Sequence, residues 1–227
     1  MSKHFQIEIE RLNGRLLAVG ATVLDTIQIA LTALEERRPA LAQQVIDGDR
    51  RIDRSEVEIE EECLKLLALY QPVAEDLRFI AAVMKINIDL ERIADEAVNI
   101  AEHAAFLAAR DPIPVPPQLA EIGDAAMRMV RESLDAFVAS DVQEALRILS
   151  EDDEVDRLNR EIIQEVWRMM RRDPDTIERA THLFSVSRHL ERIADHATNI
   201  AEDVVYIVEG TIIRHRAEGY RPKVESS

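Results

Sequence analysis

Two stretches of the chain carry oxygen-bearing side chains at helical spacing. The sequence LERIADEAVNIAE at positions 90–102 recurs as LERIADHATNIAE at 190–202, and eleven of the thirteen positions are identical. The repeated acidic and amide positions are Glu91, Asp95, Asn99 and Glu102, and then Glu191, Asp195, Asn199 and Glu202. A helix advances by about 100° per residue, so the four positions of each copy share one narrow stripe. Each stretch therefore predicts a helix with a packing side of Leu, Ile and Ala and an oxygen-rich side.

The chemistry that such a stripe suggests is metal binding. Two carboxylates one helical turn apart can reach the same cation, and carboxylate and amide oxygens suit hard divalent ions or iron. The alternative is a solvated helix face, whose surface interactions are each worth a few tenths of a kcal/mol. A solvated face requires acidity but no particular side chain, so the exact recurrence of four residue types favours a metal site. Recent duplication is a poor explanation, because the rest of the two halves has diverged.

A second repeated block lies upstream of each stripe. IDRSEVEI at 52–59 aligns with VDRLNREI at 155–162 and pairs Asp53 with Asp156. Two interpretations stay open for these aspartates. They could lend a ligand to the metal sites, or they could favour the positive end of a helix that begins near them.

The histidines near the stripes suggest metal ligands less strongly. Of His182, His189, His196 and His215, only His189 and His196 neighbour the stripe, and neither has a histidine counterpart in the first half. We expect them not to be ligands.

No catalytic machinery is visible in the sequence. A ferritin-like di-iron enzyme requires Glu-x-x-His pairs, and this spacing does not occur in the chain. The sequence also lacks a glycine-rich phosphate loop, a dinucleotide-binding fingerprint and a recognisable nucleophile motif. We therefore expect no enzyme activity. A metal-dependent enzyme or a metal store that uses the same stripes is the alternative.

The elements that position these residues are six long helices, three in each half. Six glycines in 227 residues, few aromatic residues and three-and-four apolar spacing favour an all-α fold. The expected helices span about 5–37, 39–70, 74–109, 118–139, 142–172 and 176–214. The proline-rich segment 111–117 reads as a linker between a first repeat at 1–110 and a second at 118–215, followed by a polar tail at 216–227. Short breaks within each repeat predict two antiparallel three-helix bundles.

Charge and cysteine content restrict the partners and the compartment. The net charge is −16, which disfavours nucleic acid and anionic membrane surfaces as partners. Cys63 is the single cysteine, so no intramolecular disulfide can form. The first residues lack a signal-peptide pattern, and no uninterrupted apolar stretch approaches about 18 residues. We expect a soluble, cytoplasmic protein.

The paired blocks resemble the PhoU family of phosphate-signalling proteins. The resemblance is carried by PVAEDLRFI at 72–80, followed by LERIADEAVNIAE, and by HLERIADHATNIAE at 189–202 after the second three-helix unit. It covers essentially the whole chain. It implies two three-helix bundles in a cytoplasmic negative regulator that holds phosphate-starvation genes off. The implied partners are the ATPase subunit of a phosphate ABC transporter and a membrane sensor histidine kinase, and the implied assembly is a homodimer.

The resemblance also implies metal ions or clusters at the stripes. The family motif, an acidic residue followed four positions later by Asp, falls on Glu91 with Asp95 and on Glu191 with Asp195. The segment AEDLRFI at 74–80 has no obvious equivalent in the second half, where PDTIERATHLF stands. The two sites therefore need not hold the same metal or be equally occupied.

Overall fold

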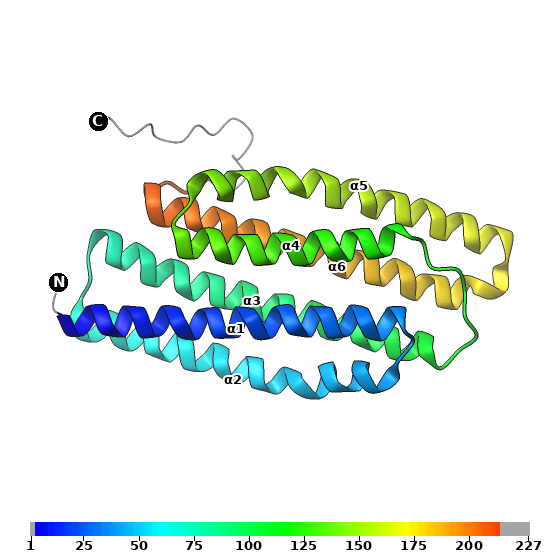
Figure 1. Ribbon diagram of the computed structural model, residues 1–227, viewed down its shortest axis with the longest axis horizontal. Helices are drawn as coiled ribbons and strands as arrows, with labels where there is room; N and C mark the ends of the chain where they lie inside the picture. Colours follow the sequence, from blue (N-terminus) through cyan, green and yellow to red (C-terminus); the bar gives the residue numbers. More distant parts are fainter. Residues whose placement is uncertain (1–2, 214–227) are drawn as a thin grey trace.

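The chain forms six long helices arranged as two three-helix bundles. The computed structural model describes residues 3–213. Its elements are α1 (Lys3–Glu35), α2 (Pro39–Tyr70), α3 (Ala74–Ala108), α4 (Gln118–Ala139), α5 (Val142–Arg172), the single 3-10 turn η1 (Pro174–Thr176) and α6 (Ile177–Glu209). No strand occurs in the described range, and the expected all-α class is confirmed. Figure 1 shows α1 to α3 as one antiparallel unit and α4 to α6 as a second unit beside it.

Several helix ends lie where the local sequence favours them. Helix α2 begins at Pro39, whose missing N–H is not needed in the first turn. Before α5, the carboxylate of Asp141 accepts hydrogen bonds from the backbone N–H groups of Gln143 and Glu144 at 2.9 and 3.1 Å. Helix α4 ends at Ala139, and the residue that follows, Ser140, adopts a left-handed conformation with φ 52°.

Two of the predicted helix ends are wrong. The first helix ends at Glu35, because Arg37 turns left-handed with φ 52°. The last helix ends at Glu209 and not near position 214. Gly210 takes φ 67°, which a residue without Cβ adopts at little cost, and its N–H bonds to the carbonyl of Tyr206. The predicted polar tail, 216–227, lies outside the described residues.

Among the described helices, α1 alone is long and apolar enough to cross a membrane. It contains an 18-residue window with mean hydropathy 1.7, enough by length and composition to cross a membrane, although Asp25 interrupts the apolar residues of the helix. One side of α1 is nevertheless in the protein core, where Leu12, Leu16, Val23 and Ile27 are fully buried. The buried helix of a soluble protein passes the same test, so this property gives only weak support for a membrane span.

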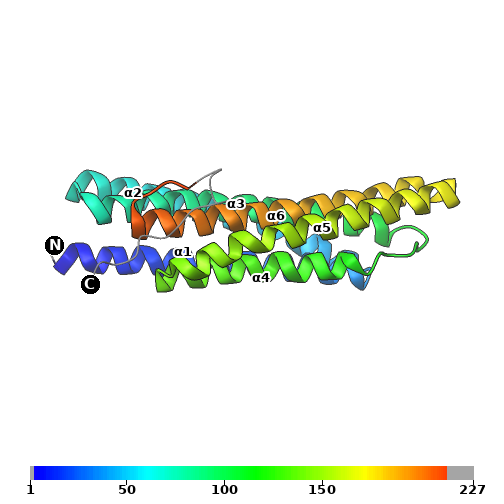
Figure 2. The ribbon, with the colours of Figure 1, turned by 90° about the horizontal axis from the view of Figure 1, so that it is seen from above.

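The two bundles share one core. Helices α3 and α6 run antiparallel along the centre of the molecule, and α1 approaches α4 on one side (Figure 2). The approach of α1 to α4 depends on one glycine from each unit. A Cβ added at Gly20 would lie 2.6 Å from Leu134 Cδ1, and one added at Gly123 would lie 3.0 Å from Leu31 Cδ1. Gly20 and Gly123 occupy equivalent positions of the repeat, so the two units are related by an approximate two-fold axis.

A row of polar pairs crosses the contact between α3 and α6. The Nδ1 atom of His196 lies 2.8 Å from Asp89 Oδ1, and the Nδ1 atom of His189 lies 2.6 Å from Glu96 Oε2. The row continues at one end with His103 and His182, whose Nδ1 atoms are 2.8 Å apart. The members of each helix are seven residues apart, which is two helical turns, so they face the same neighbour repeatedly. At the other end, Lys85 Nζ lies 2.8 Å from Asp203 Oδ1.

Glu96 is a buried acid of this row. Its side chain is 5% exposed and also lies 3.0 Å from Arg192 Nη1. Burial alone would raise the pKa of Glu96, but the hydrogen bond with His189 and the charge of Arg192 outweigh it, and this pKa is lowered. A carboxyl with a lowered pKa stabilises the fold above its unfolded pKa, and this contribution disappears as the pH falls through the folded value.

We therefore predict that Glu96→Gln lowers the free energy of unfolding at pH 7 by about 1–3 kcal/mol, because His189 and Arg192 lose their buried anion. The difference from the parent protein should shrink as the pH falls below about 4, where Glu96 is itself protonated. Urea unfolding at both pH values measures it. Glu10→Gln, an exposed position on α1, is the matched control and should change stability little. Equal effects of the two substitutions would contradict the role of Glu96.

Candidate functional site

The repeated stripes lie on α3 and α6, with the division into two sides that the sequence predicts. The apolar side of α3 is buried at Leu90, Ile93, Ala94, Ala97, Ile100 and Ala101, and the matching residues of α6 are buried as well. On the other side, Glu91 and Asn99 are half-buried, and Asp95 and Glu102 are exposed. In α6, Asp195 is exposed, whereas Glu191, Asn199 and Glu202 are half-buried. The oxygen-rich side thus remains open to water and ions.

In the first unit, the stripe faces two aspartates of α2. The pKa of Glu91 is raised by burial and by the charges of Asp95 and Asp53. The pKa of Asp95 is raised by desolvation against the packed helices and by Asp53, although its side chain still reaches solvent. The pKa of Asp49 is raised by burial, Asp53 and Asp95. We call Asp49, Asp53, Glu91 and Asp95 the first carboxylate cluster.

The second unit repeats this arrangement between α5 and α6. Burial, together with the charges of Asp195 and Asp156, raises the pKa of Asp152 to about 6. The pKa of Asp195 is raised by desolvation and by Glu191. Burial also raises the pKa of Glu191, although Arg188 lies 2.8 Å away and opposes the shift. We call Asp152, Asp156, Glu191 and Asp195 the second carboxylate cluster.

Both clusters have the donor chemistry of a hard-cation site. Four carboxylates supply oxygen ligands of the kind that Mg²⁺, Mn²⁺, Ca²⁺ and iron accept. Burial is the main cause of the raised pKa values of Asp49 and Asp152, and repulsion by neighbouring carboxylates, which a cation would relieve, adds to it. Asp49 Oδ1 and Glu191 Oε2 are buried and accept no hydrogen bond. In residues 3–213, however, no three His, Cys, Asp or Glu side chains already converge as a metal site does. The residue types fit a cation, and the side chains would have to turn inward to enclose it.

The structure places the predicted site residues in two groups. Glu91, Asp95, Glu191 and Asp195 lie in the clusters, and Asp53 and Asp156 join them from the neighbouring helix. Asn199 lies apart from that group, because its Nδ2 donates a hydrogen bond to Asp89 Oδ1 on α3 at 3.2 Å. Asn99, Glu102 and Glu202 are the remaining stripe positions. The role of all eight stripe residues as metal ligands, and that of Asp53 and Asp156, stays a prediction.

Two cluster residues were missed in the sequence. Asp49 and Asp152 stand four positions before Asp53 and Asp156, so the second helix of each unit carries its own pair of aspartates one turn apart. Asp152 follows Asp49 by 103 positions, and Asp156 follows Asp53 by the same number, which is also the offset between the two upstream blocks. This recurrence was a readable signal of two facing pairs of carboxylates.

The histidines beside the stripe have a structural role that the sequence did not suggest. His189 and His196 pair with Glu96 and Asp89 across the contact between the units. Their counterparts in the first repeat are Asp89 and Glu96, which explains why no matching histidine is found there. Of the remaining histidines, His182 pairs with His103, and His215 lies outside the described residues.

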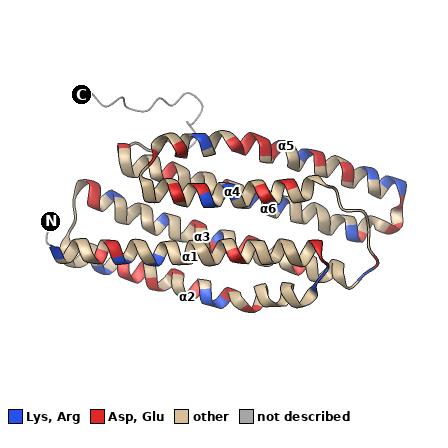
Figure 3. Ribbon diagram, in the orientation of Figure 1, with Lys and Arg blue, Asp and Glu red and all other residues tan. Residues whose placement is uncertain are grey.

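Acidic residues occur along both units (Figure 3), so charge alone does not single out the clusters. Comparison with known proteins gives the broader context. The family model for the PhoU domain matches residues 16–104 and again 119–204. The chain is 42% identical over 216 residues to a protein of Pseudomonas putida named phosphate-specific transport system accessory protein PhoU homolog. This match covers 95% of the chain and 84% of the relative.

Solved structures agree with the sequence comparison. The crystal structure of PhoU from Pseudomonas aeruginosa superposes with a TM-score of 0.89 at 41% identity, covering 91% of this chain and all of that one. The phosphate transport system regulatory protein PhoU from Streptococcus pneumoniae gives a TM-score of 0.87 at 31% identity, covering 92% of this chain and 98% of that one. Family model, sequence relatives and fold all agree, and the chain belongs to the PhoU family.

Proposed function

We propose that the protein is a cytoplasmic accessory regulator that restrains phosphate uptake and phosphate-starvation signalling when phosphate is plentiful. The observation that carries this proposal is identity of about two in five residues, over nearly the whole chain, to relatives named as accessory proteins of phosphate transport. In this role it would act as an adaptor. Its partners would be the ATPase subunit of a phosphate ABC transporter and a sensor histidine kinase, and it would act as a homodimer.

We further propose that both carboxylate clusters bind metal ions. Each cluster places two acidic residues of one helix opposite two of the next. Burial and then the charges of neighbouring carboxylates raise the pKa values of Glu91 and Asp152, and a cation would neutralise those charges. When bound, a divalent ion or iron would supply positive charge and fix the helices of a unit relative to each other. The carboxylates of Glu91 and Asp95, and of Glu191 and Asp195, would hold it, together with the aspartates of α2 and α5. Neither cluster is proposed to carry out a reaction.

The cellular prediction concerns both sites at once. In a strain that lacks its own copy of the gene, the parent protein should restore repression of a phosphate-starvation reporter in phosphate-rich medium. The combined change Glu91→Gln, Asp95→Asn, Glu191→Gln and Asp195→Asn should lose bound metal and most of this repression, because the carboxylates that would hold the ion are removed and the helices of each unit are no longer fixed by it. Reporter activity, phosphate uptake and metal content are the measurements.

The control for that experiment removes four exposed carboxylates elsewhere, with Glu10→Gln, Glu121→Gln, Asp124→Asn and Asp135→Asn. It makes the same change in net charge and should leave repression intact.

A capture of partners from phosphate-rich cells should recover a transporter ATPase subunit or a sensor kinase, and recovery of neither would contradict the adaptor role. A metal-dependent turnover that the cluster variant abolishes would instead favour the enzyme alternative.

Replacing Asp152 by Asn should stabilise the fold but weaken metal binding at the second cluster. Because its pKa is raised to about 6, the fold confines a charged carboxylate above that pH, and stability is lost as the pH rises from about 4 to about 6. Asp152→Asn should therefore raise the free energy of unfolding of chelator-treated protein at pH 7.5 by about 1–2 kcal/mol, after allowance for solvent screening. At pH 4 the gain should be small.

The same substitution should weaken Mn²⁺ binding at least tenfold at the second cluster, because one of its four carboxylates is removed. Urea unfolding and isothermal titration with MnCl₂ measure the two effects. Asp124→Asn, on the exposed side of α4, is the control and should change neither. If Asp152→Asn left both stability and Mn²⁺ affinity unchanged, the second cluster would be an ordinary solvated surface.

A further inference from the structure

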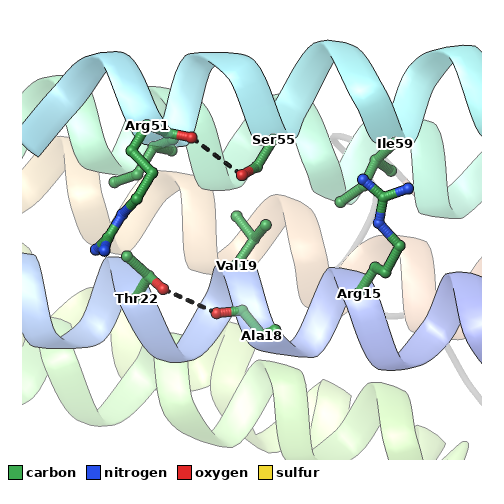
Figure 4. A pocket seen from close by; sticks show the side chains of 8 residues that line it. Arg15, Ala18, Val19, Thr22, Arg51, Ser55 and Ile59 are labelled. Carbon is green, nitrogen blue, oxygen red and sulfur yellow. Dashed lines mark hydrogen bonds between the residues drawn. The ribbon is translucent and has the colours of Figure 1, made fainter.

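We propose that the groove between α1 and α2 binds a small organic phosphate. The groove has a volume of about 290 Å³ and lies on the first unit, away from the face of α2 that carries the carboxylate cluster. Figure 4 shows its lining, with Arg51 and Thr22 at one end, Arg15 at the other, and Ser55 and Val19 between them. This volume is too large for inorganic phosphate alone and approaches the size of small-molecule pockets.

The two ends of the groove differ in available charge. Arg15 Nη1 and Nη2 lie 2.6 Å from Glu62 Oε2 and Glu58 Oε2, so this guanidinium is already neutralised and forms a wall that joins α1 to α2. The side chain of Arg51 is exposed, and Figure 4 shows it extending towards Thr22. The groove continues past Arg51 into a hollow of about 540 Å³ that Arg50 and Arg54 also line. The anionic part of a ligand therefore belongs at the Arg51 end.

A guanidinium favours a phosphoryl group, because its parallel N–H groups can bond two oxygens at once. Arg51 has two further arginines beside it, in a chain whose net charge is −16. Asp25 and Asp47 line the same hollow and limit its positive potential. One phosphoryl group is consequently a better match than a long polyanion.

The rest of the groove suits the organic part of the ligand. Val19, Ile52 and Ile59 form an apolar floor and are each less than 9% exposed. The hydroxyls of Thr22 and Ser55 donate hydrogen bonds to the carbonyls of Ala18 and Arg51 at 3.0 Å, so their oxygens remain able to accept from a ligand. A ring or short chain that bears hydroxyl or amino groups would meet both surfaces.

In the second unit, larger and oppositely charged side chains occupy the positions that correspond to Ser55 and Arg51 of the groove. With the register that pairs Asp53 with Asp156, Ser55 corresponds to Leu158 and Arg51 to Glu154. Leu158 is buried, at 3% exposed, and Glu154 pairs with the arginine three positions later. The repeat therefore exchanges a small hydroxyl residue for a filling leucine and a cation for an anion. Only the first unit keeps the polar, open version of this position.

The test is isothermal titration of the full chain with glycerol 3-phosphate, glucose 6-phosphate and adenosine 5′-monophosphate. A chelator is present throughout, so that metal at the clusters cannot recruit phosphate and the result is independent of the metal proposal. At least one compound should bind with one-to-one stoichiometry and a dissociation constant of about 1 mM or tighter. Inorganic phosphate and adenosine, which each lack one half of the ligand, should bind at least tenfold more weakly.

The variants are taken from the second repeat of the same chain. Arg51→Glu and Ser55→Leu should each weaken binding at least tenfold, the first by reversing the charge and the second by filling the groove. Arg131→Glu, at an exposed position on α4, makes the same charge change and should bind like the parent protein. Urea unfolding confirms that each variant is folded. The proposal is overturned if no compound of the three saturates at 10 mM, if both variants bind normally, or if inorganic phosphate binds equally well.

Discussion

Helices α3 and α6 pack against each other while each also presents carboxylates to the second helix of its own unit. The packing residues and the carboxylates lie on the same two or three turns of each helix. The apolar side buries Leu90, Ile93 and Ile100 and their copies in α6, and this burial keeps the backbone of each stripe fixed. The polar pairs between the units then set the alignment of one helix along the other. The two carboxylate clusters depend on a second alignment, that of α3 with α2 and of α6 with α5, because a shift by one turn within a unit would separate their members.

The clusters are costly for the fold in the absence of a cation. Carboxylates that repel one another and lose contact with water raise their own pKa values, as Asp152 shows most strongly. Such a penalty persists where function benefits from it, and a bound cation would convert it into attraction. The long apolar helices offset the penalty by burying a continuous core through both units. Core packing and the proposed metal binding therefore fall on opposite sides of the same helices.

Most of the fold could be predicted because the signals are local. Proline at position 39, the break at Gln71 and Pro72, and the proline-rich linker all interrupt helices in sequence, and four helices began and ended within a residue of the expected places. Gly210 was overlooked as a helix end, since the residues after it continue an apolar pattern. The carboxylate stripes were predictable from helical angles. The recurrence of Asp49 as Asp152 was readable, but the turn of α3 or α6 that each aspartate faces was not, because which turn of one helix lies beside another is decided by tertiary packing.

The polar pairs between α3 and α6 also favour the packing of the first repeat against the second over the packing of two identical repeats. Antiparallel packing brings position 89 of the first repeat against 196 of the second, and 96 against 189. Two identical first repeats packed in this way would place Asp89 opposite Glu96 twice, and two identical second repeats would place histidine opposite histidine. Only the packing of the first repeat against the second places a histidine beside both Asp89 and Glu96. Like the complementary charges that select partners in coiled coils, this arrangement favours the mixed pair over either matched one. The two repeats differ at the positions of Asp89 and Glu96, where the second repeat has His189 and His196. This difference makes each repeat complementary to the other repeat of the same chain and not to a copy of itself.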